Sequence, residues 1–249
     1  MTPDFRPTSR WSQPRWVLAL IALLALLILS PSFFLGPPDG HDFVFHISSW
    51  RDIAQQWREG IAFPRWAEGA NWRYGDPRFI FYPPVSMFLG ALLGLAVPWV
   101  AVPCVFIFLC LLLGGASMYR LAREWLPPEA SAAAALIYVA NPYQLIVVYV
   151  RTDFAELLAA SLLPLAVLYA LRCSALQFES SAGTAAGLRD IVALAVVYGG
   201  IWLTNAPAAV VTSYALALLF FVTAAVERSA RPLVRGGAAI LLGLALAGV

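Results

Sequence analysis

Residues 16–35 read WVLALIALLALLILSPSFFL and contain no charged side chain. Arginines stand before this run at positions 6, 10 and 15, as in a secretory signal peptide, but no small-x-small cleavage site precedes Pro37 and Pro38. A helix of about 20 apolar residues is long enough to span the hydrocarbon core of a bilayer. We therefore interpret the run as an uncleaved signal anchor and as the first membrane crossing.

The composition of the whole chain is that of a membrane protein. Of the 249 residues, 61% are hydrophobic and 12% are charged, whereas a soluble domain carries about 25% charged residues. The lipid bilayer must therefore solvate part of the apolar surface. The net charge of +2 gives no indication of a nucleic-acid partner. The three cysteines lie in or beside apolar segments without metal-ligand spacing, which is typical of small buried hydrophobic residues.

Further apolar segments follow at residues 81–97, 98–119, 130–149, 154–171, 189–205, 206–226 and 236–249. Segment 81–97 opens with Pro83 and Pro84 and is 17 residues long, at the lower limit for a membrane span. Whether this segment crosses decides which face of the membrane each later loop occupies.

The arginines of the short loops decide this question. If 81–97 crosses, seven of them lie in the cytoplasm and four lie outside; if it lies in the outer interface, the split is ten to one, with only Arg151 outside. Cytoplasmic loops carry the excess of basic residues, which favours the second arrangement. We expect seven crossings, one at 16–35 and six from residue 98 onward, with the N-terminus in the cytoplasm.

These crossings predict a single all-α module over residues 1–249, a polytopic transmembrane helical bundle. Residues 36–97 form a long first extracytoplasmic loop together with the interfacial segment, and residues 98–249 hold the six further crossings. The last apolar segment, 236–249, is only 14 residues long and has no polar end. We therefore expect the chain to be the N-terminal part of a longer protein.

The first outer loop contains GHDFVFHISSWRDIAQQWREG at residues 40–60. Phe43, Ile47, Trp50, Ala54 and Trp57 recur at spacings of four and three, which is the period of one helix face. We expect residues 42–58 to form a helix that lies on the membrane surface, with this apolar stripe toward the lipid.

Asp42 and His46 stand four residues apart on the flank of the apolar stripe, where the helix would hold them near the depth of a lipid phosphate. They are candidate catalytic residues. A structural role is the alternative for Asp42, because a carboxylate in the first turn complements the helix dipole. Asp52 lies on the polar side of the same helix, and we expect its replacement by asparagine to be nearly silent.

Arginines alternate with aromatic residues along the rest of this loop, at Arg65, Arg73, Arg78 and Tyr82 among others. Such a mixture suits an anionic headgroup, or a sugar stacked on a ring, and these four residues are candidates for substrate binding. It is equally typical of the aromatic belt of any membrane protein.

A second outer turn, RTDFAE at residues 151–156, carries Asp153 and Glu156. Carboxylates so close to the membrane are costly and are functional candidates by default, although they could instead be solvated caps of the following helix. Because Asp42 lies on the same outer face, the two loops could converge on one metal or one substrate. The crossings themselves hold almost no ionisable residue at mid-depth, which disfavours an ion-coupled transporter.

The chain resembles the bacterial membrane-protein family labelled "6-pyruvoyl-tetrahydropterin synthase-related" over essentially all of its length. The resemblance rests on GHDFVFH, FPRW, GDPRFIFYPP, MYRLAREW, NPY, RTDFAELLAASLLPL and WLTNAP. Its architecture in turn resembles the GT-C superfamily of glycosyltransferases, which use polyprenyl-phosphate sugars. Those enzymes have surface-lying helices and a catalytic aspartate in the first outer loop, and an acidic motif in the second.

This resemblance implies a multi-pass glycosyltransferase of the bacterial inner (plasma) membrane, or its N-terminal module, acting on the extracytoplasmic side. The donor would be a polyprenyl-phosphate-linked sugar. Asp42 would be the general base and His46 would orient it, while Arg65, Arg73 or Arg78 would neutralise the phosphate. The alternative is a non-catalytic membrane component that binds lipid or glycolipid, and a transporter is a third class.

The second-loop acid is carried over to Asp153 or Glu156, which would hold the acceptor or a divalent metal such as Mg or Mn. Here the chain departs from the superfamily, because RTDFAE does not reproduce its usual acidic pair.

Overall fold

The computed structural model describes residues 14–174 and 184–248, and these residues form helices and connecting loops without a β-strand. The nearest approach to a strand is an isolated antiparallel bridge between Ala67 and Asp76. The prediction of an all-α chain is confirmed for this part of the protein.

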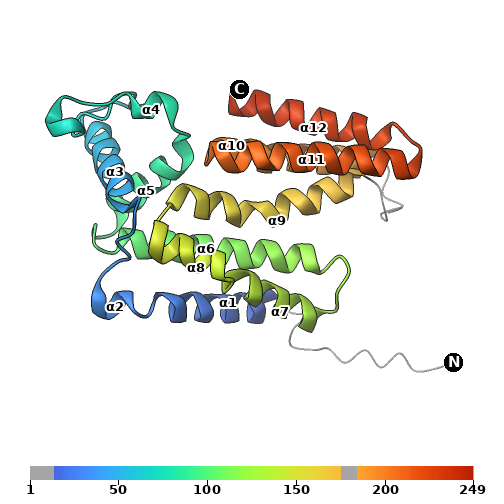
Figure 1. Ribbon diagram of the computed structural model, residues 1–249, viewed down its shortest axis with the longest axis horizontal. Helices are drawn as coiled ribbons and strands as arrows, with labels where there is room; N and C mark the ends of the chain where they lie inside the picture. Colours follow the sequence, from blue (N-terminus) through green and yellow to red (C-terminus); the bar gives the residue numbers. More distant parts are fainter. Residues whose placement is uncertain (1–13, 175–183, 249) are drawn as a thin grey trace.

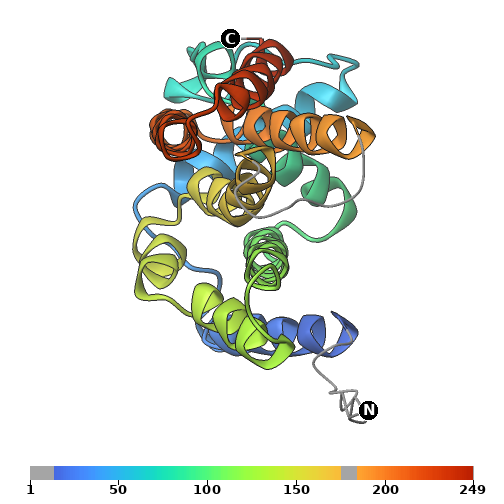
Figure 2. The same ribbon diagram turned by 90° about the vertical axis from the view of Figure 1, so that its right-hand side faces the viewer.

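The long helices lie side by side and run lengthwise through the molecule (Figure 1). In the view turned by 90°, α1 and α7 lie at the bottom, α6 and then α9 lie above them, and α10, α11 and α12 lie toward the top (Figure 2). Their bounds are α1 Pro14–Leu29, α6 Val102–Ala122, α7 Pro128–Val139, α9 Phe154–Ser174, α10 Thr184–Trp202, α11 Ala206–Glu227 and α12 Arg231–Ala247.

Four stretches of the described residues are long and apolar enough to cross a membrane: α6, α9, α11 and the stretch Pro128–Arg151. The last of these is not one regular helix. It consists of α7, the short α8 (Pro142–Ile146) and the π-helical η3 (Val147–Arg151), with a break at Asn141 and Pro142. Seven crossings, as expected from the sequence, remain a prediction.

Residues 30–101 all lie at one end of the bundle, because α1 ends there and α6 begins there (Figure 1). This end contains α2 (Ser32–Leu35), α3 (Phe43–Arg58), η2 (Asn71–Arg73), α4 (Arg78–Phe81) and α5 (Pro84–Ala96). With 13 residues, α5 is about 20 Å long, shorter than the roughly 30 Å of a hydrocarbon core. The geometry agrees with an interfacial position for segment 81–97.

The helix expected at residues 42–58 is present as α3, but the expectation that Trp50 faces the lipid is wrong. The Trp50 side chain is fully buried, and its ring stacks on Phe106 of α6 with the ring centroids 5.1 Å apart. Gly90 of α5 allows this packing, because a Cβ there would lie 2.1 Å from the indole. The middle of the stripe, Trp50 and Ala54, is therefore buried inside the protein, whereas Phe43 and Ile47 at its start are only half-buried.

Two clusters of buried apolar side chains form the core, and α9 belongs to both. Its first turns, including Phe154 and Leu157, pack with α1, α3, α6 and α7. From Ala159 onward it packs with α10, α11 and α12. The start of α9 is thus held between the end of the bundle that contains residues 30–101, which we call the loop end, and the last three helices. This packing fixes the position of the acidic turn before α9.

Candidate functional site

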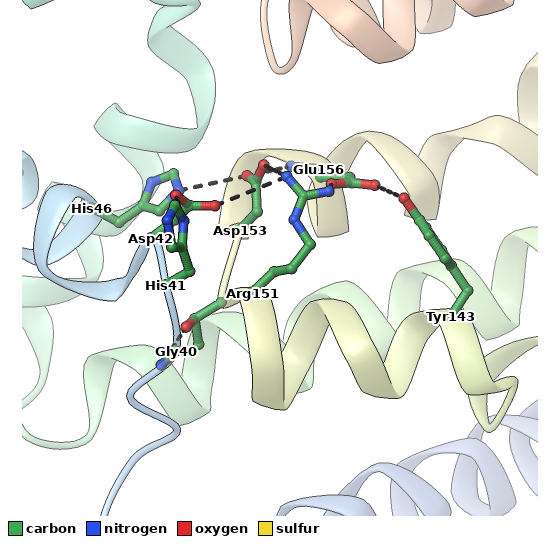
Figure 3. A network of polar contacts seen from close by, with 9 residues as sticks. Gly40, His41, Asp42, His46, Tyr143, Arg151, Asp153 and Glu156 are labelled. Atoms are coloured by element: carbon green, nitrogen blue, oxygen red, sulfur yellow. Dashed lines mark hydrogen bonds and ion pairs between the residues drawn. The ribbon is translucent and has the colours of Figure 1, made fainter.

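The segment Gly40–Asp42, just before α3, is hydrogen-bonded to the turn between η3 and α9. Three backbone N–H groups donate across this junction: Gly40 N to Thr152 Oγ1 (2.7 Å), His41 N to Val150 O (3.1 Å) and Asp42 N to Arg151 O (2.7 Å). Residues more than a hundred positions apart in the chain thereby form one site, at the loop end of the bundle (Figure 3).

Local backbone features make this close approach feasible. A Cβ at residue 40 would lie 2.4 Å from both Thr152 Oγ1 and Val150 O, so only glycine fits. Thr152 adopts a left-handed conformation with φ of 51°, directly after the π-helical turn of η3. Single π-helical turns are frequent at functional sites, and here the turn sets Arg151 beside the first loop.

Arg151 is the centre of a charged cluster (Figure 3). Its guanidinium lies 2.6 Å from Glu156 Oε2, 3.4 Å from Asp153 Oδ2 and 3.9 Å from Asp42 Oδ2. Tyr143 of α8 also donates a hydrogen bond from its hydroxyl to Glu156 Oε1. Three carboxylates against one guanidinium leave an excess of two negative charges when both His41 and His46 are neutral.

Asp42 is placed at the N-cap of α3, but its side chain makes no capping hydrogen bond. Its Oδ1 instead lies 2.9 Å from His41 Nδ1, and its Oδ2 faces Arg151. The carboxylate is 29% exposed, so a substrate can reach it. The Asp42 side chain therefore does not cap the helix by a hydrogen bond, while its position at the N-terminus still allows the favourable interaction with the helix dipole.

His46 contacts the second-loop acid and not the carboxylate of Asp42. Its side chain is 4% exposed, and Nε2 lies 3.5 Å from Asp153 Oδ1. The ring packs edge-on against Phe154, while Nδ1 is buried without a hydrogen-bond partner in the described residues. The expectation that His46 orients Asp42 is thus replaced by a contact that holds Asp153; only the backbone of His46 bonds to Asp42, at its carbonyl.

Asp153 caps α9, because its Oδ1 accepts the backbone N–H of Glu156 at 2.9 Å. Burial raises the pKa of this carboxyl, but the hydrogen bond from His46, the N–H of Glu156 and the charges of His46 and Arg151 together outweigh burial, so the pKa lies below its ordinary value. Asp153 is therefore ionised at neutral pH. It serves as a cap and as a member of the cluster at once.

Two of the four predicted substrate-binding residues lie together, and the other two lie elsewhere in the loop. Arg78 and Tyr82 gather around Phe45 of α3, with the Arg78 guanidinium 4.8 Å from the ring centroid. Arg78 also donates to Ser49 Oγ at 3.2 Å. Arg65 lies over the ring of Phe63, and Arg73 is exposed in η2.

Arg151 is the arginine that meets Asp42, and sequence reasoning missed this role. From the sequence, Arg151 served only to establish the topology. The one available signal was its position two residues before Asp153 in an outer turn.

A cavity of about 620 Å³ lies between α9 and α11 and ends at the charged cluster. Its polar end contains Arg151, Glu156 and Asn205, while farther along the helices its walls are aliphatic. The lining residues are Tyr143, Arg151, Asp153, Glu156, Ala160, Leu163, Ala166, Val167, Asn205, Pro207, Ala208, Val211, Thr212, Ala215 and Leu216. We call it the α9–α11 groove.

Within the described residues, no group of three or more His, Cys, Asp or Glu side chains is arranged to hold a metal ion. Mg²⁺ commonly needs less, because one or two carboxylates, water and substrate phosphate oxygens complete its shell. Asp153 and Glu156, in a cluster with an excess of two negative charges, fit that type of site. The charge balance thus suits a divalent cation that arrives with a phosphate.

Comparison with known proteins shows a family to which the chain is similar. The model of the 6-pyruvoyl-tetrahydropterin synthase related domain, described as a membrane protein, matches residues 79–249. No curated protein and no solved structure was found to match the chain. The matched region includes the turn with Arg151, Asp153 and Glu156 and both walls of the α9–α11 groove.

Proposed function

The chain belongs to the 6-pyruvoyl-tetrahydropterin synthase related family of membrane proteins, and from this premise we propose that it is a glycosyltransferase, or the N-terminal module of one, acting on a polyprenyl-phosphate-linked sugar. The observation that carries the proposal is the junction of the aliphatic α9–α11 groove with the charged cluster. A polyprenyl-phosphate sugar has two matching parts. Its long apolar chain suits the aliphatic groove, and its charged head, which carries the sugar, suits the charged cluster.

The proposed location is the bacterial inner membrane, with the N-terminus cytoplasmic and the cluster on the extracytoplasmic side. Arg120, Arg123 and Arg172 lie at the end of the bundle where α1 begins, whereas Arg151 lies at the loop end. Basic residues concentrate on the cytoplasmic side of membrane proteins. We take α1, α10 and α12 as the three crossings beyond the four long apolar stretches, in a GT-C-like arrangement.

In this proposal the prenyl chain lies in the α9–α11 groove and the phosphate reaches Arg151. The guanidinium can exchange a carboxylate partner for phosphate oxygens, because it recognises both with the same paired N–H geometry. A divalent metal such as Mg or Mn, held by Asp153 and Glu156, would supply the positive charge that the phosphate needs beyond Arg151. His46, Tyr143 and the N–H of Glu156 keep these two carboxylates in place.

Asp42 would act as general base toward the acceptor. Its carboxylate takes the proton of an acceptor hydroxyl while that oxygen bonds to the anomeric carbon of the sugar. The bond from this carbon to the phosphate oxygen breaks, and its electron pair stays on the phosphate. Such a leaving group needs charge neutralisation more than protonation, which is the role of Arg151.

A non-catalytic component that binds lipid or glycolipid is the second candidate, and one observation favours it. Arg151 already pairs with carboxylates from both loops, as a structural clamp would. The same groove would then hold a lipid without any chemistry. Turnover separates the two candidates.

The test uses the full-length protein in proteoliposomes with radiolabelled polyprenyl-phosphate sugars, and measures the release of sugar from the lipid. Asp42→Asn should reduce turnover by about 10²–10⁴-fold, the usual contribution of a general base. Asp39→Asn is the matched control, because Asp39 lies exposed three residues away in the same loop. Wild-type turnover in Asp42→Asn would overturn the assignment of the base, and binding without turnover in the wild type would favour the lipid-binding component.

A further inference from the structure

A second hollow, of about 460 Å³, lies along α3 outside the charged cluster. It starts at Phe43, the residue after Asp42, and extends along the helix as far as Gln55. The segment after Ala67 forms its other wall. The lining residues are Phe43, Val44, Ile47, Ser48, Arg51, Asp52, Gln55, Gly69, Ala70 and Arg78. We call it the α3 hollow.

The walls of the α3 hollow are held together by polar contacts. The backbone N–H of Gly69 donates to Asp52 Oδ2 at 3.1 Å, and Arg78 donates to Ser49 Oγ at 3.2 Å. These contacts tie the loop to the helix at two separate places. The hollow is therefore a preformed feature of the fold. Because Asp52 accepts a hydrogen bond from Gly69, Asp52→Asn alters a structural contact, and it does not serve as the silent control that the sequence suggested.

The chemistry of the lining changes along the hollow. Near Asp42 it is apolar, with Phe43, Ile47 and Val44, and Val44 is 70% exposed. Farther along it becomes polar, with Arg51 and Gln55 among the lining side chains. An exposed apolar surface next to hydrogen-bonding groups in a hollow indicates a ligand with both kinds of surface.

The polar side chains retain hydrogen-bonding capacity of both kinds. The guanidinium carbon of Arg51 lies 5.4 Å from the centroid of the Trp99 ring, and a cation–π contact of this kind does not consume the N–H donors of the guanidinium. Gln55 donates to Glu59 through Nε2 and keeps its carbonyl oxygen as an acceptor. Asp52 has a second carboxylate oxygen beyond the one that Gly69 uses.

Donors and acceptors side by side suit hydroxyl groups, which both donate and accept. A phosphate would gain from Arg51 and Arg78 and would be repelled by the carboxylate of Asp52, whereas hydroxyl groups can use the donors and the acceptors together. A sugar ring combines an apolar C–H face with hydroxyls at its edge, and the volume lies in the usual range for small-molecule sites. We propose that the α3 hollow is a carbohydrate subsite.

Resting on the proposed function, this subsite holds the acceptor. The first lining residue of the hollow, Phe43, directly follows Asp42 in the chain. In this proposal an acceptor held in the hollow presents its hydroxyl to the Asp42 carboxylate, while the donor lies in the α9–α11 groove.

The test measures binding without catalysis. The full-length protein in detergent is titrated with the methyl glycosides of glucose, galactose, mannose and N-acetylglucosamine, and binding is followed by saturation-transfer difference NMR. At least one glycoside should bind, and Gln55→Leu should weaken its binding about tenfold or more, a loss of one good hydrogen-bonding partner. Arg58→Gln, on the same helix outside the hollow, should bind as the wild type does.

A second variant, Val44→Trp, fills the exposed apolar side of the hollow and should abolish glycoside binding while the protein stays folded. Binding that survives both Gln55→Leu and Val44→Trp would overturn the subsite, as would binding of dihexanoyl phosphatidylglycerol without any glycoside. Glycoside binding with no donor turnover would support the subsite and reject the proposed function. Donor turnover to water with no glycoside binding would overturn the subsite alone.

Discussion

The junction between the segment before α3 and the turn before α9 is open to a direct test at Gly40. Gly40→Ala places a Cβ at 2.4 Å from the backbone oxygen of Val150, so the segment before α3 must move away from the turn. Three hydrogen bonds cross this junction, and each contributes a net of about 0.5–1.5 kcal/mol. Their loss corresponds to about 1.5–4.5 kcal/mol, or an opening equilibrium raised about ten- to a thousandfold.

Hydrogen–deuterium exchange of the peptide that covers residues 37–45 measures this opening. Exchange at amides 40–42 should accelerate by the stated factor, while the core of α3 stays protected because Trp50 is buried against α6. Gly237→Ala is the control, since a Cβ there meets no atom within 4 Å. Unchanged exchange at amides 40–42 in Gly40→Ala would refute the junction, and with it the common site.

Three further predictions concern packing, pH and topology. Trp50→Ala should lower the free energy of unfolding by about 3–5 kcal/mol in a thermal melt, whereas a lipid-facing tryptophan would leave the melt nearly unchanged. Because the pKa of Asp153 is lowered on folding, its ionised form stabilises the fold above the unfolded pKa of about 3.9, and this contribution is lost as pH falls through the folded value. The destabilisation by Asp153→Asn should therefore be present at about pH 5 and shrink below about pH 4, and a destabilisation that is unchanged at about pH 2 would contradict it. Single cysteines at Arg120 and Arg151, in a cysteine-free background, should label from the cytoplasmic and the outer side respectively, and labelling of both from one side would reject the proposed topology.

The helical fold follows from the sequence because long apolar runs in lipid must satisfy their backbone hydrogen bonds internally. The start and end of α3 were predicted closely for a similar reason, since its apolar residues recur at helical spacing. What covers that stripe could not be predicted. Periodicity shows that one face is apolar, but only the tertiary structure shows that Phe106 and Gly90, and not lipid, lie against Trp50.

The acidic residues of the site were predictable, whereas their partners were not. Asp42, Asp153 and Glu156 stood out because carboxylates near a membrane are costly. The pairing of Asp42 with Arg151 depends on a junction between segments more than a hundred residues apart and on a π-helical turn, and neither leaves a local pattern in the sequence. The same holds for His46, whose partner could be identified only once α9 was placed.

The most direct test of the common donor site is a cryo-electron microscopy structure of the full-length protein with a non-hydrolysable polyprenyl-phosphonate analogue. The phosphonate should lie within hydrogen-bonding distance of the Arg151 guanidinium, beside the Asp42 carboxylate, with the prenyl chain along the aliphatic walls of the α9–α11 groove. A phosphonate bound away from Arg151, or a prenyl chain outside that groove, would contradict the proposal.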